Sequence, residues 1–496
     1  MVNTHVCIHG HFYQPPRENP FTGMVEDQPS ASPYANWNQR IDAECYGPNA
    51  HASVLGDDGN ELFTIDNYEW ISSDWGPTLL RWLEEHSPRT YASIISADRR
   101  SIVRFDGHGS ALAHAYNHTI LPLSNSRDKR TQVLWGIADF EHRFGRSPVG
   151  MWLPETAVDL ESLEIMAAAG IRFTVLAPYQ ARRVHHDGEP RDVTGGSIDP
   201  RTPYLVQLPS GAEIAVFFYD GSLSQEIAFD GLLEDGILLA NRLADAAGSA
   251  DAPVLANVAT DGETFGHHHR FGEMALAKAI MTLDAREDVV LTNFASFLDT
   301  RPPTDTVEIN EGTSWSCAHG VERWRSNCGC STGQNAGWDQ EWRAHLRTSL
   351  DFLRDSLIPE FERLGGELLV DAWEARDRYV EVLLGASPTS FLAKHQLRPL
   401  DPDEASRAVD LLEIQHSAML MYTSCGWFFD DISGVETVFV LRQAGRAIDL
   451  ARRATGVDLE PEFLEWLEKA HSNEEGVTGR HVYEKTVSPY MPARTD

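Results

Sequence analysis

The sequence predicts an α/β barrel followed by an α-helical C-terminal domain. Over residues 1–300, short apolar runs alternate with segments of helical periodicity, and polar side chains follow directly after the apolar runs. Such alternation is typical of a parallel sheet covered by helices. Polar clusters after strands are typical of the rim where barrels and open sheets build active sites. We favour a barrel because these clusters are spread over the whole first half of the chain.

The predicted elements of this region follow one another in order. Strands are expected at 2–8, 91–96, 148–152, 171–177, 214–219, 253–260 and 289–292. Helices with one apolar face are expected at 130–144, 160–169, 232–247 and 273–283. Several of these strands end just before a histidine or a carboxylic acid, so we expect these polar side chains to meet at one rim of the barrel.

Three domains or regions are expected. Residues 1–300 form the barrel, and a Pro- and Thr-rich stretch follows it. Residues 301–337 are a region rich in Cys and Trp that we expect as a loop near the active site, since long loops are usually functional or disordered. Residues 338–496 form the helical domain.

Helical periodicity and capping signals define that last domain. Asp401 and Pro402 form an N-cap and N1 pair, and a helix at 434–455 is closed by Gly456. A further helix is expected at 461–470. A helical stripe at the start of the domain consists of Trp338, Trp342, Leu346, Leu350, Leu353 and Leu357.

Composition and charge narrow the class of protein. The 496-residue chain has a net charge of −33, which disfavours a nucleic-acid or anionic-membrane partner because both need basic patches. Residues 1–30 lack the apolar core of a signal peptide, and no run of 18 apolar residues is present. With six cysteines, the sequence predicts a cytoplasmic protein with reduced thiols.

Strand-end carboxylic acids suggest glycoside chemistry. Glu155, Asp220, Asp261 and Glu263 each follow a predicted strand, beside aromatic residues. Cleavage of a glycosidic bond needs one carboxyl group to protonate the leaving oxygen and a second to attack or to activate water. A strand-end acid is also a common helix cap, and "DGS" after Tyr219 is equally typical of a turn.

Several motifs in this region resemble those of glycoside hydrolase family 57. "HGHFYQPP" from His9 resembles the first family motif, "MWLPE" ends in Glu155, and "TDGETFG" contains Asp261. The resemblance covers residues 1–300 and implies an incomplete (β/α)7 barrel with retaining activity on α-linked glucan. It implies Glu155 as the nucleophile and Asp261 as the general acid/base, with no metal or other cofactor. The C-terminal part resembles a subgroup with a helical domain of unknown function.

The resemblance also implies substrate contacts. We expect His9, His11 and Gln14 to line the sugar site, and aromatic and polar side chains after other strands and loops to grip hydroxyl groups. These further candidates are Trp152, Asp220, Glu263, His267, Trp315, Trp324, Trp427 and Asp430. For the aromatic residues of "GWFFDD", packing between helices is the alternative interpretation.

One motif departs from the family pattern. The second family motif usually places a Glu after a Gly, but the matching stretch "DGHGSALAHAYNHTILPL" has His108, Ser110, His114 and His118 and no Glu. A substrate contact is therefore changed, which leaves the amylase or 4-α-glucanotransferase type of specificity open.

The sequence also contains two alternative sets of metal ligands. His9, His11 and Asp261, with the triplet 267–269, contain the ligand types of a zinc site. Such a site would indicate a metal-dependent deacetylase- or mannosidase-like hydrolase. A second ligand set is Cys317, His319, Cys328 and Cys330, although Cys-x-Cys is not the usual zinc spacing and reduced cysteines in a packed loop were the favoured interpretation.

The sequence thus favours a retaining glycosidase or transglycosidase that works by double displacement, with its two carboxyl groups about 5–5.5 Å apart. The remaining alternative is a carbohydrate-binding protein without catalysis. Nothing in the sequence indicates a partner protein or an oligomeric state.

Overall fold

The computed structural model describes residues 4–56, 58–248, 250 and 252–492. The strand predicted at 2–8 begins outside these ranges. The first residues of the predicted barrel and the last residues of the predicted helical domain also lie outside them. The chain divides into two compact units. The first comprises Met1–Gln14, Asp27–Ala115 and Phe140–Trp315, and the second comprises Pro15–Glu26, Tyr116–Asp139 and Ser316–Asp496. The expected loop region 301–337 is therefore divided between the units after Trp315.

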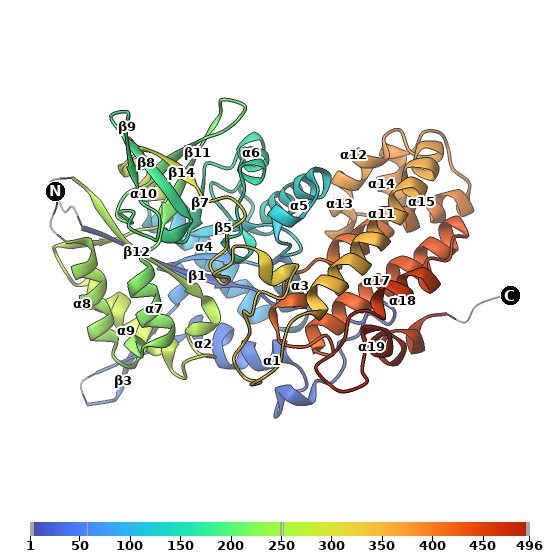
Figure 1. Ribbon diagram of the computed structural model, residues 1–496. Helices are drawn as coiled ribbons and strands as arrows, with labels where there is room; N and C mark the ends of the chain where they lie inside the picture. The colour runs from blue at the N-terminus through green and yellow to red at the C-terminus, as the bar shows by residue number, and fades with distance from the viewer. Residues whose placement is uncertain (1–3, 57, 249, 251, 493–496) are drawn as a thin grey trace. The chain divides into compact units, whose positions relative to one another are not determined.

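Parallel strands form an open barrel in the first unit (Figure 1). They are β1 (Thr4–Phe12), β4 (Ser72–Trp75), β5 (Ala111–His114), β6 (Met151–Trp152), β7 (Phe173–Leu176), β11 (Glu213–Phe218) and β12 (Val254–Asp261). The ladder runs β12-β1-β4-β5-β6, and a bridge between Gly150 and Phe173 continues it to β7 and β11. The Asp220 backbone N–H donates to Asn257 O at 2.8 Å, which links the end of β11 to β12 without a ladder. The incomplete (β/α)7 barrel is confirmed.

Helices follow most of the barrel strands, and acidic N-caps begin several of them. Asp159, Asp220 and Asp235 each accept a backbone N–H in the first turn of the helix that follows. The helices that contain residues of this unit are α1 (Trp37–Ile41), α2 (Gly47–Asn49), α3 (Pro77–His86), α4 (Pro88–Arg104), α5 (Ser126–Phe144), α6 (Leu160–Ala168), α7 (Gly221–Phe229), α8 (Gly236–Ala247), α9 (Gly272–Asp284) and α10 (Phe294–Thr300). The unit division cuts α5 after Asp139.

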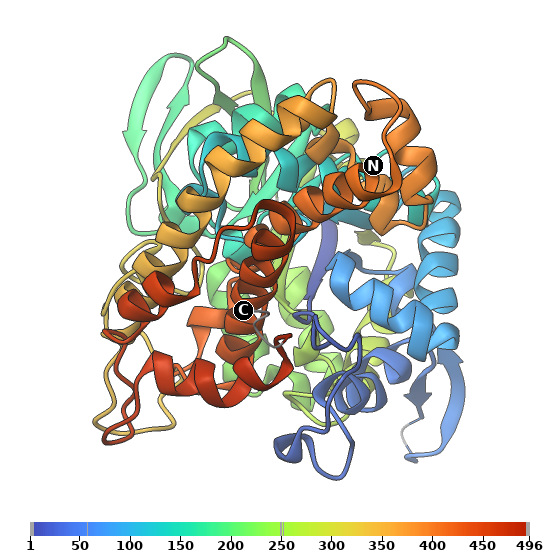
Figure 2. The same cartoon turned by 90° about the vertical axis from the view of Figure 1, so that its right-hand side faces the viewer.

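Further strands extend the sheet beyond the barrel. The second sheet runs β7-β11-β10-β14-β8-β9, and its green hairpins project from the barrel in Figure 2. The added strands are β8 (Ala181–His186), β9 (Glu189–Asp192), β10 (Tyr204–Gln207) and β14 (Thr306–Ile309). A separate hairpin joins β2 (Ala52–Leu55) and β3 (Glu61–Ile65), and β13 (Val289–Leu291) pairs with the first residues of β1.

The barrel interior is packed with apolar side chains. One cluster gathers buried residues from at least five barrel strands and from α10, including Leu112, Trp152, Phe173, Phe217 and Phe294. Phe217 and Phe294 lie with ring centroids 4.9 Å apart. Because this cluster fills the barrel, the polar side chains gather at the carboxyl ends of its strands.

The second unit is helical, as expected. Its helices from residue 342 onward are α11 (Trp342–Leu368), α12 (Ala372–Arg378), α13 (Val380–Leu383), α14 (Pro388–His395), α15 (Pro402–Leu420), α16 (Cys425–Phe428), α17 (Val435–Thr455), α18 (Glu460–Leu467) and α19 (Gly479–Thr486). Asp401 caps α15 in a capping box with Glu404, and Gly456 ends α17 with φ 77°. The predicted apolar stripe is buried in α11, except that Trp338 precedes the helix and is 37% exposed.

Two features of the barrel differ from the prediction. The expected strand at 91–96 is wrong, because these residues lie inside α4, which begins with Pro88 at its first turn. A short apolar run such as Ile94-Ile95 is compatible with either element. Conversely, β4 and β5 were not predicted, since "SSDW" and "ALAH" are poor in β-branched residues.

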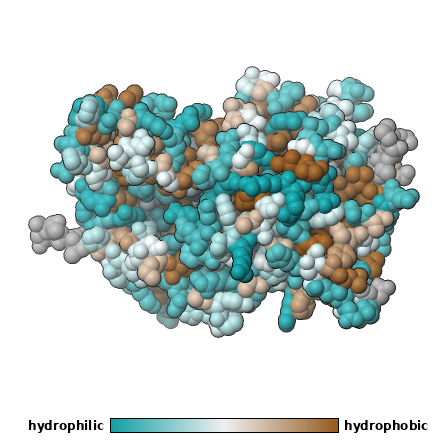
Figure 3. Space-filling model, turned by 180° about the vertical axis from the view of Figure 1, so that it is seen from behind, coloured by the Kyte–Doolittle hydropathy of each residue, from teal (hydrophilic) through white to brown (hydrophobic). Residues whose placement is uncertain are grey.

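The surface is largely hydrophilic on the face drawn in Figure 3, where apolar side chains form small patches separated by polar ones. Among the described residues, no helix combines the length and apolar character needed to cross a bilayer.

Gly150 provides a test of the junction between the two sheets. A Cβ at this position would lie 2.3 Å from Cζ of the buried Phe173, so we expect Gly150→Ala to lower the free energy of unfolding by about 1–3 kcal/mol. Gly366→Ala in α11 meets no atom within 4 Å and is the control, with an expected gain of up to about 1 kcal/mol. Thermal unfolding of both variants measures this, and an undiminished Tm for Gly150→Ala would contradict the packing described.

Candidate functional site

Strand register brings polar side chains to one level at the carboxyl end of the barrel. His11 on β1 lies opposite Asp261 on β12 and opposite Asp74 on β4. Further round the barrel, His114 on β5 lies opposite Trp152 on β6. The fold thus brings together residues that are far apart in the sequence.

Asp74 is the buried centre of this rim, with 0% of its surface exposed. His9 Nε2 donates to its Oδ1 at 3.1 Å, and His11 Nδ1 donates to its Oδ2 at 2.9 Å. His114 Nε2 lies 3.9 Å from the same Oδ2. His9 Nδ1 is also 3.0 Å from Ser72 Oγ. We call His9, His11, His114 and Asp74 the Asp74 cluster.

The Asp74 cluster contains a buried ion pair. Burial by itself raises the pKa of Asp74, but the charge and hydrogen bonds of the histidines outweigh it and lower that pKa to about 2. Burial lowers the pKa of His11, yet Asp74 outweighs that effect and raises it to about 9. For His9 and for His114, whose pKa falls to about 4, burial dominates. The pair therefore stabilises the fold fully between about pH 4 and 6.5. Its contribution is lost as pH falls through about 2 or rises through about 9.

Aromatic rings stack on the Asp74 cluster. Trp152 is fully buried and lies with its ring 4.7 Å from that of His9 and 5.3 Å from that of His11, both nearly parallel. His11 also stacks on His114 at 5.6 Å, and Tyr13 stacks on His114 at 5.9 Å. The imidazole planes are therefore fixed both by hydrogen bonds and by packing.

Glu155 follows β6 in a turn with left-handed backbone, at φ 56° and ψ 22°. Trp315 donates two hydrogen bonds to this turn. Its backbone N–H donates to Glu155 O at 2.9 Å, and its indole N–H donates to Glu155 Oε2 at 2.9 Å. The Trp315 ring also packs edge-on against Trp152 and His11, at 5.1 and 6.0 Å. The Glu155 carboxylate is thus oriented toward the same rim as the Asp74 cluster.

Asp261 ends β12 with its side chain exposed to solvent, although protein atoms surround it on most sides. This crowding raises the pKa of Asp261, while the nearby His11 cation lowers it and Asp74 raises it further. A carboxyl group that retains its proton to higher pH and still reaches solvent is suited to proton transfer.

Glu263 lies two residues beyond Asp261 and is buried. The Tyr46 hydroxyl donates to Glu263 Oε1, and Gln14 Nε2 is 3.5 Å from the same oxygen. Burial and the negative charge of Asp261 raise the pKa of Glu263 to about 7. This group can accept or donate a hydrogen bond near neutral pH, which suits recognition of a hydroxyl.

Two further expected residues have structural partners. Asp220 caps α7, accepting the Leu223 N–H at 3.0 Å, so the helix-cap interpretation applies to it. His267 Nδ1 pairs with Glu44 Oε2 at 2.5 Å.

The described side chains do not form the alternative zinc site expected at His9, His11, Asp261 and the triplet 267–269. His9 and His11 direct ring nitrogens at the Asp74 carboxylate, and His267 and His269 direct theirs at Glu44 and at the Ala228 carbonyl. Within the described residues, the groups of three or more close ligand atoms do not include His9 with His11 and Asp261.

Three expected glucan contacts lie in the second unit and are buried there. Trp324 and Trp427 are each 0% exposed, and their indole N–H groups donate to the carbonyls of Ser424 and Arg343. The Asp430 carboxylate accepts two hydrogen bonds from Thr332. A sugar ring cannot stack on a covered indole, so the structure corrects these expectations in favour of packing.

Sequence reasoning missed Asp74 and Tyr46. Asp74 is itself a strand-end acid. It was missed because "SSDW" lacks the β-branched residues that indicate a strand. Tyr46 lies in an irregular helical segment, Asp42–Tyr46, for which the sequence carries no functional signal. His114, noted only as part of the altered motif, belongs to the Asp74 cluster.

The chain is thus an α/β-barrel protein whose polar rim lies at the carboxyl ends of its strands. A family model described as "Glycosyl hydrolase family 57" matches residues 62–310, half of the chain, and the chain belongs to this family. A second model, "Domain of unknown function (DUF3536)", matches residues 338–494. The resemblance read from the motifs is confirmed for both parts.

Solved structures share the fold. An exo-type maltose-forming amylase from Pyrococcus sp. ST04 superimposes with a TM-score of 0.69 at 17% identity, covering 95% of this chain and 83% of that one. A 4-alpha-glucanotransferase from Thermococcus litoralis gives 0.55 at 16% identity, covering 91% and 60%. A branching enzyme from Pyrococcus horikoshii gives 0.55 at 14% identity, covering 100% and 98%.

Among curated proteins, alpha-amylase 1 from Dictyoglomus thermophilum is 27% identical over 188 residues. The match covers 38% of this chain and spans only about a quarter (24%) of that relative's length.

The ion pair predicts the titration of His11. In Asp74→Asn the carboxylate charge is lost, and burial is then opposed only by Asp261 and Glu263, so we expect the pKa of His11 to fall clearly from about 9. NMR titration of the imidazole signals measures this. His267→Gln serves as the control for assignment, because His267 pairs with Glu44 instead. Equal His11 titration in the wild type and in Asp74→Asn would refute the pairing.

Proposed function

We propose that this protein is a retaining glycosidase or transglycosidase that acts on α-linked glucan, with Glu155 as nucleophile and Asp261 as general acid/base. The observation that carries the proposal is the placing of these two acids at strand ends of one rim. Glu155 is bonded to Trp315, whose ring contacts His11, and His11 pairs with Asp261 in the register of β1 and β12.

In the first step, Asp261 donates its proton to the glycosidic oxygen while Glu155 attacks the anomeric carbon. The raised pKa of Asp261 supports the acid role, because the group must hold a proton before the bond breaks. In the second step, Asp261 accepts a proton from water or from an acceptor sugar, and the glycosyl ester at Glu155 is released.

The surrounding residues have binding and positioning roles in this proposal. His11, held by Asp74, presents an imidazole of fixed orientation to sugar hydroxyls. His9 is fully buried and both of its ring nitrogens meet Ser72 and Asp74, so it positions Asp74 instead of making the expected sugar contact. Trp152 supports both rings, and Trp315 orients the Glu155 carboxylate. Gln14 and Glu263 form a second hydroxyl-binding group with Tyr46.

The relatives support the substrate class. Their names include amylases, a 4-alpha-glucanotransferase and a branching enzyme, which differ in the acceptor and the linkage but share α-glucan as substrate. The stretch that matches the second family motif has no Glu, and its His114 stacks on both His11 and Tyr13. We therefore expect the specificity at this subsite to differ from that of enzymes with the usual motif.

Substitution of the two acids tests the assignment. Glu155→Gln and Asp261→Asn should each lower turnover of α-glucan by at least about 10²–10³-fold while oligosaccharide binding persists, since shape is kept and only the reacting group is lost. Asp220→Asn is the matched control, because Asn also caps a helix and turnover should remain near wild type. Wild-type turnover in either acid variant would refute that residue's role.

Mass spectrometry of products from amylose, glycogen, maltooligosaccharides, trehalose and pullulan, with and without EDTA, reads out the reaction. Shorter products alone indicate hydrolysis, and a ladder of longer and shorter products indicates transfer. Binding of these glucans with no product from any of them would identify a carbohydrate-binding protein and refute catalysis.

The pH profile tests the link between His11 and Asp261. The basic limb of kcat/KM should report loss of the Asp261 proton, and the His11 cation lowers the pKa of Asp261. Removing that cation in His11→Gln should therefore move the basic limb to higher pH, whatever happens to kcat itself. His267→Gln should leave the limb in place, because the His267 ring pairs with Glu44 and is not among the groups that shift the pKa of Asp261. An unmoved or lowered limb in His11→Gln would contradict the assignment.

A further inference from the structure

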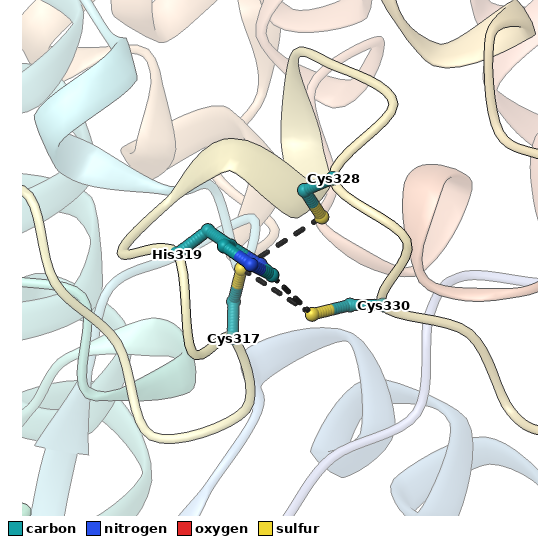
Figure 4. Close-up of side chains that lie close together, drawn as sticks. All are labelled: Cys317, His319, Cys328 and Cys330. Atoms are coloured by element: carbon teal, nitrogen blue, oxygen red, sulfur yellow. Dashed lines mark hydrogen bonds between the residues drawn. The ribbon is translucent and has the colours of Figure 1, made fainter.

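A cluster of sulfur and nitrogen ligands lies in the second unit, in a segment that has little regular structure. Between Ser316 and Gly337 the backbone forms one short 3-10 turn, Glu322–Trp324, and otherwise loops. Cys317, His319, Cys328 and Cys330 converge from the two halves of this loop (Figure 4). Their ligand atoms all lie within 4.8 Å of one another.

The spacing of these atoms matches a tetrahedral metal site. Zn–S bonds of about 2.3 Å and Zn–N bonds of about 2.0–2.1 Å at tetrahedral angles place two sulfurs about 3.8 Å apart and a sulfur and a nitrogen about 3.6 Å apart. Cys317 Sγ is 3.9 Å from Cys328 Sγ and 3.8 Å from Cys330 Sγ, and Cys330 Sγ is 3.6 Å from His319 Nδ1. A disulfide would bring two sulfurs to about 2.05 Å, and all three cysteines are free thiols.

The backbone accommodates the unusual Cys-x-Cys spacing. The Gly329 between Cys328 and Cys330 has φ 81°, a left-handed backbone that glycine adopts readily and that bends the chain tightly between the two cysteines. The Cys317 and His319 pair has the same one-residue spacing on the facing half of the loop. Each half therefore supplies two ligands to one point.

Two buried arginines brace the loop beside the cluster. Arg323 donates to Ser316 O at 3.0 Å, and Arg343 donates to Cys330 O at 2.8 Å. The other described hydrogen bonds of the two guanidinium groups go to the carbonyls of Phe428 and Phe429. Arg343 Nε is buried without a hydrogen-bond partner among the described residues. A Zn²⁺ ion with three thiolates and one neutral imidazole carries one net negative charge, which these cations would balance.

We propose that Cys317, His319, Cys328 and Cys330 bind one Zn²⁺ ion as a structural site. Protein ligands occupy all four tetrahedral positions, which is typical of structural rather than catalytic zinc. The metal would close a loop that has little regular secondary structure. This site is separate from the proposed catalytic residues and does not depend on their assignment.

Metal analysis of the purified full-length protein tests the proposal. We expect about one zinc per chain in the wild type, retained on dialysis, and a loss of at least about tenfold in Cys328→Ser/Cys330→Ser. Cys425→Ser is the matched control, because Cys425 lies in the same unit outside the cluster and should leave the zinc content unchanged. Absence of zinc from the wild type, or equal zinc in the double variant, would overturn the site.

Cobalt substitution of the wild-type protein keeps the test independent of how the double variant folds. Co²⁺ in a site with three thiolates should give a sulfur-to-metal charge-transfer band and the visible bands of tetrahedral cobalt. A spectrum without charge transfer, or a disulfide between two of the three cysteines found by mass spectrometry, would overturn the proposal. Glucan turnover that is lost with EDTA but kept in Cys328→Ser/Cys330→Ser would instead locate a required metal outside this cluster.

Discussion

The barrel rim depends on one carboxylate that has no contact with solvent. A buried charge costs several kcal/mol unless it is paired and hydrogen-bonded. Asp74 meets that requirement only through His9 and His11, which alternate along β1 and therefore point to the same side of the strand. Once both rings are held, Trp152 and His114 can stack against them. The orientation of the rim thus follows from the need to satisfy one buried acid.

The second constraint is the turn at Glu155. A non-glycine residue with φ 56° is strained by about 1 kcal/mol or more, and Thr156 next to it is also left-handed, at φ 51°. Trp315 compensates with its two hydrogen bonds to Glu155. The residue proposed to attack the sugar is therefore positioned by a loop that is remote in sequence, and its geometry does not come from β6 alone. Strain held in this way is common where a reacting group must be presented outward.

These two constraints explain what the sequence could and could not predict. Periodicity located Glu155 and Asp261 because each follows a strand with a clear apolar run. The same signal predicted other barrel strands and helices, but it placed a strand at 91–96 where α4 lies and it missed β4 and β5. Asp74 escaped because its strand is short and polar, and its role exists only through tertiary pairing. Asp220 has the same local signal as Asp261, yet it caps a helix. Local sequence alone does not distinguish a strand-end acid at the barrel rim from one that caps a helix.

Aromatic residues carry the same ambiguity in the second unit. Trp324 and Trp427 suggested stacking on sugar, but each indole N–H reaches a backbone carbonyl, which is how buried tryptophans are usually satisfied. The neighbouring arginines differ, because Arg343 and Arg323 bond only to carbonyl dipoles in the described part of the chain. In the barrel, the Asp74 carboxylate balances the charge of the buried His11 cation. In the described part of the chain, no carboxylate is hydrogen-bonded to the guanidinium groups of Arg323 and Arg343. The proposed thiolate cluster around Zn²⁺ would place negative charge beside these guanidinium groups, in addition to that of the nearby Asp430.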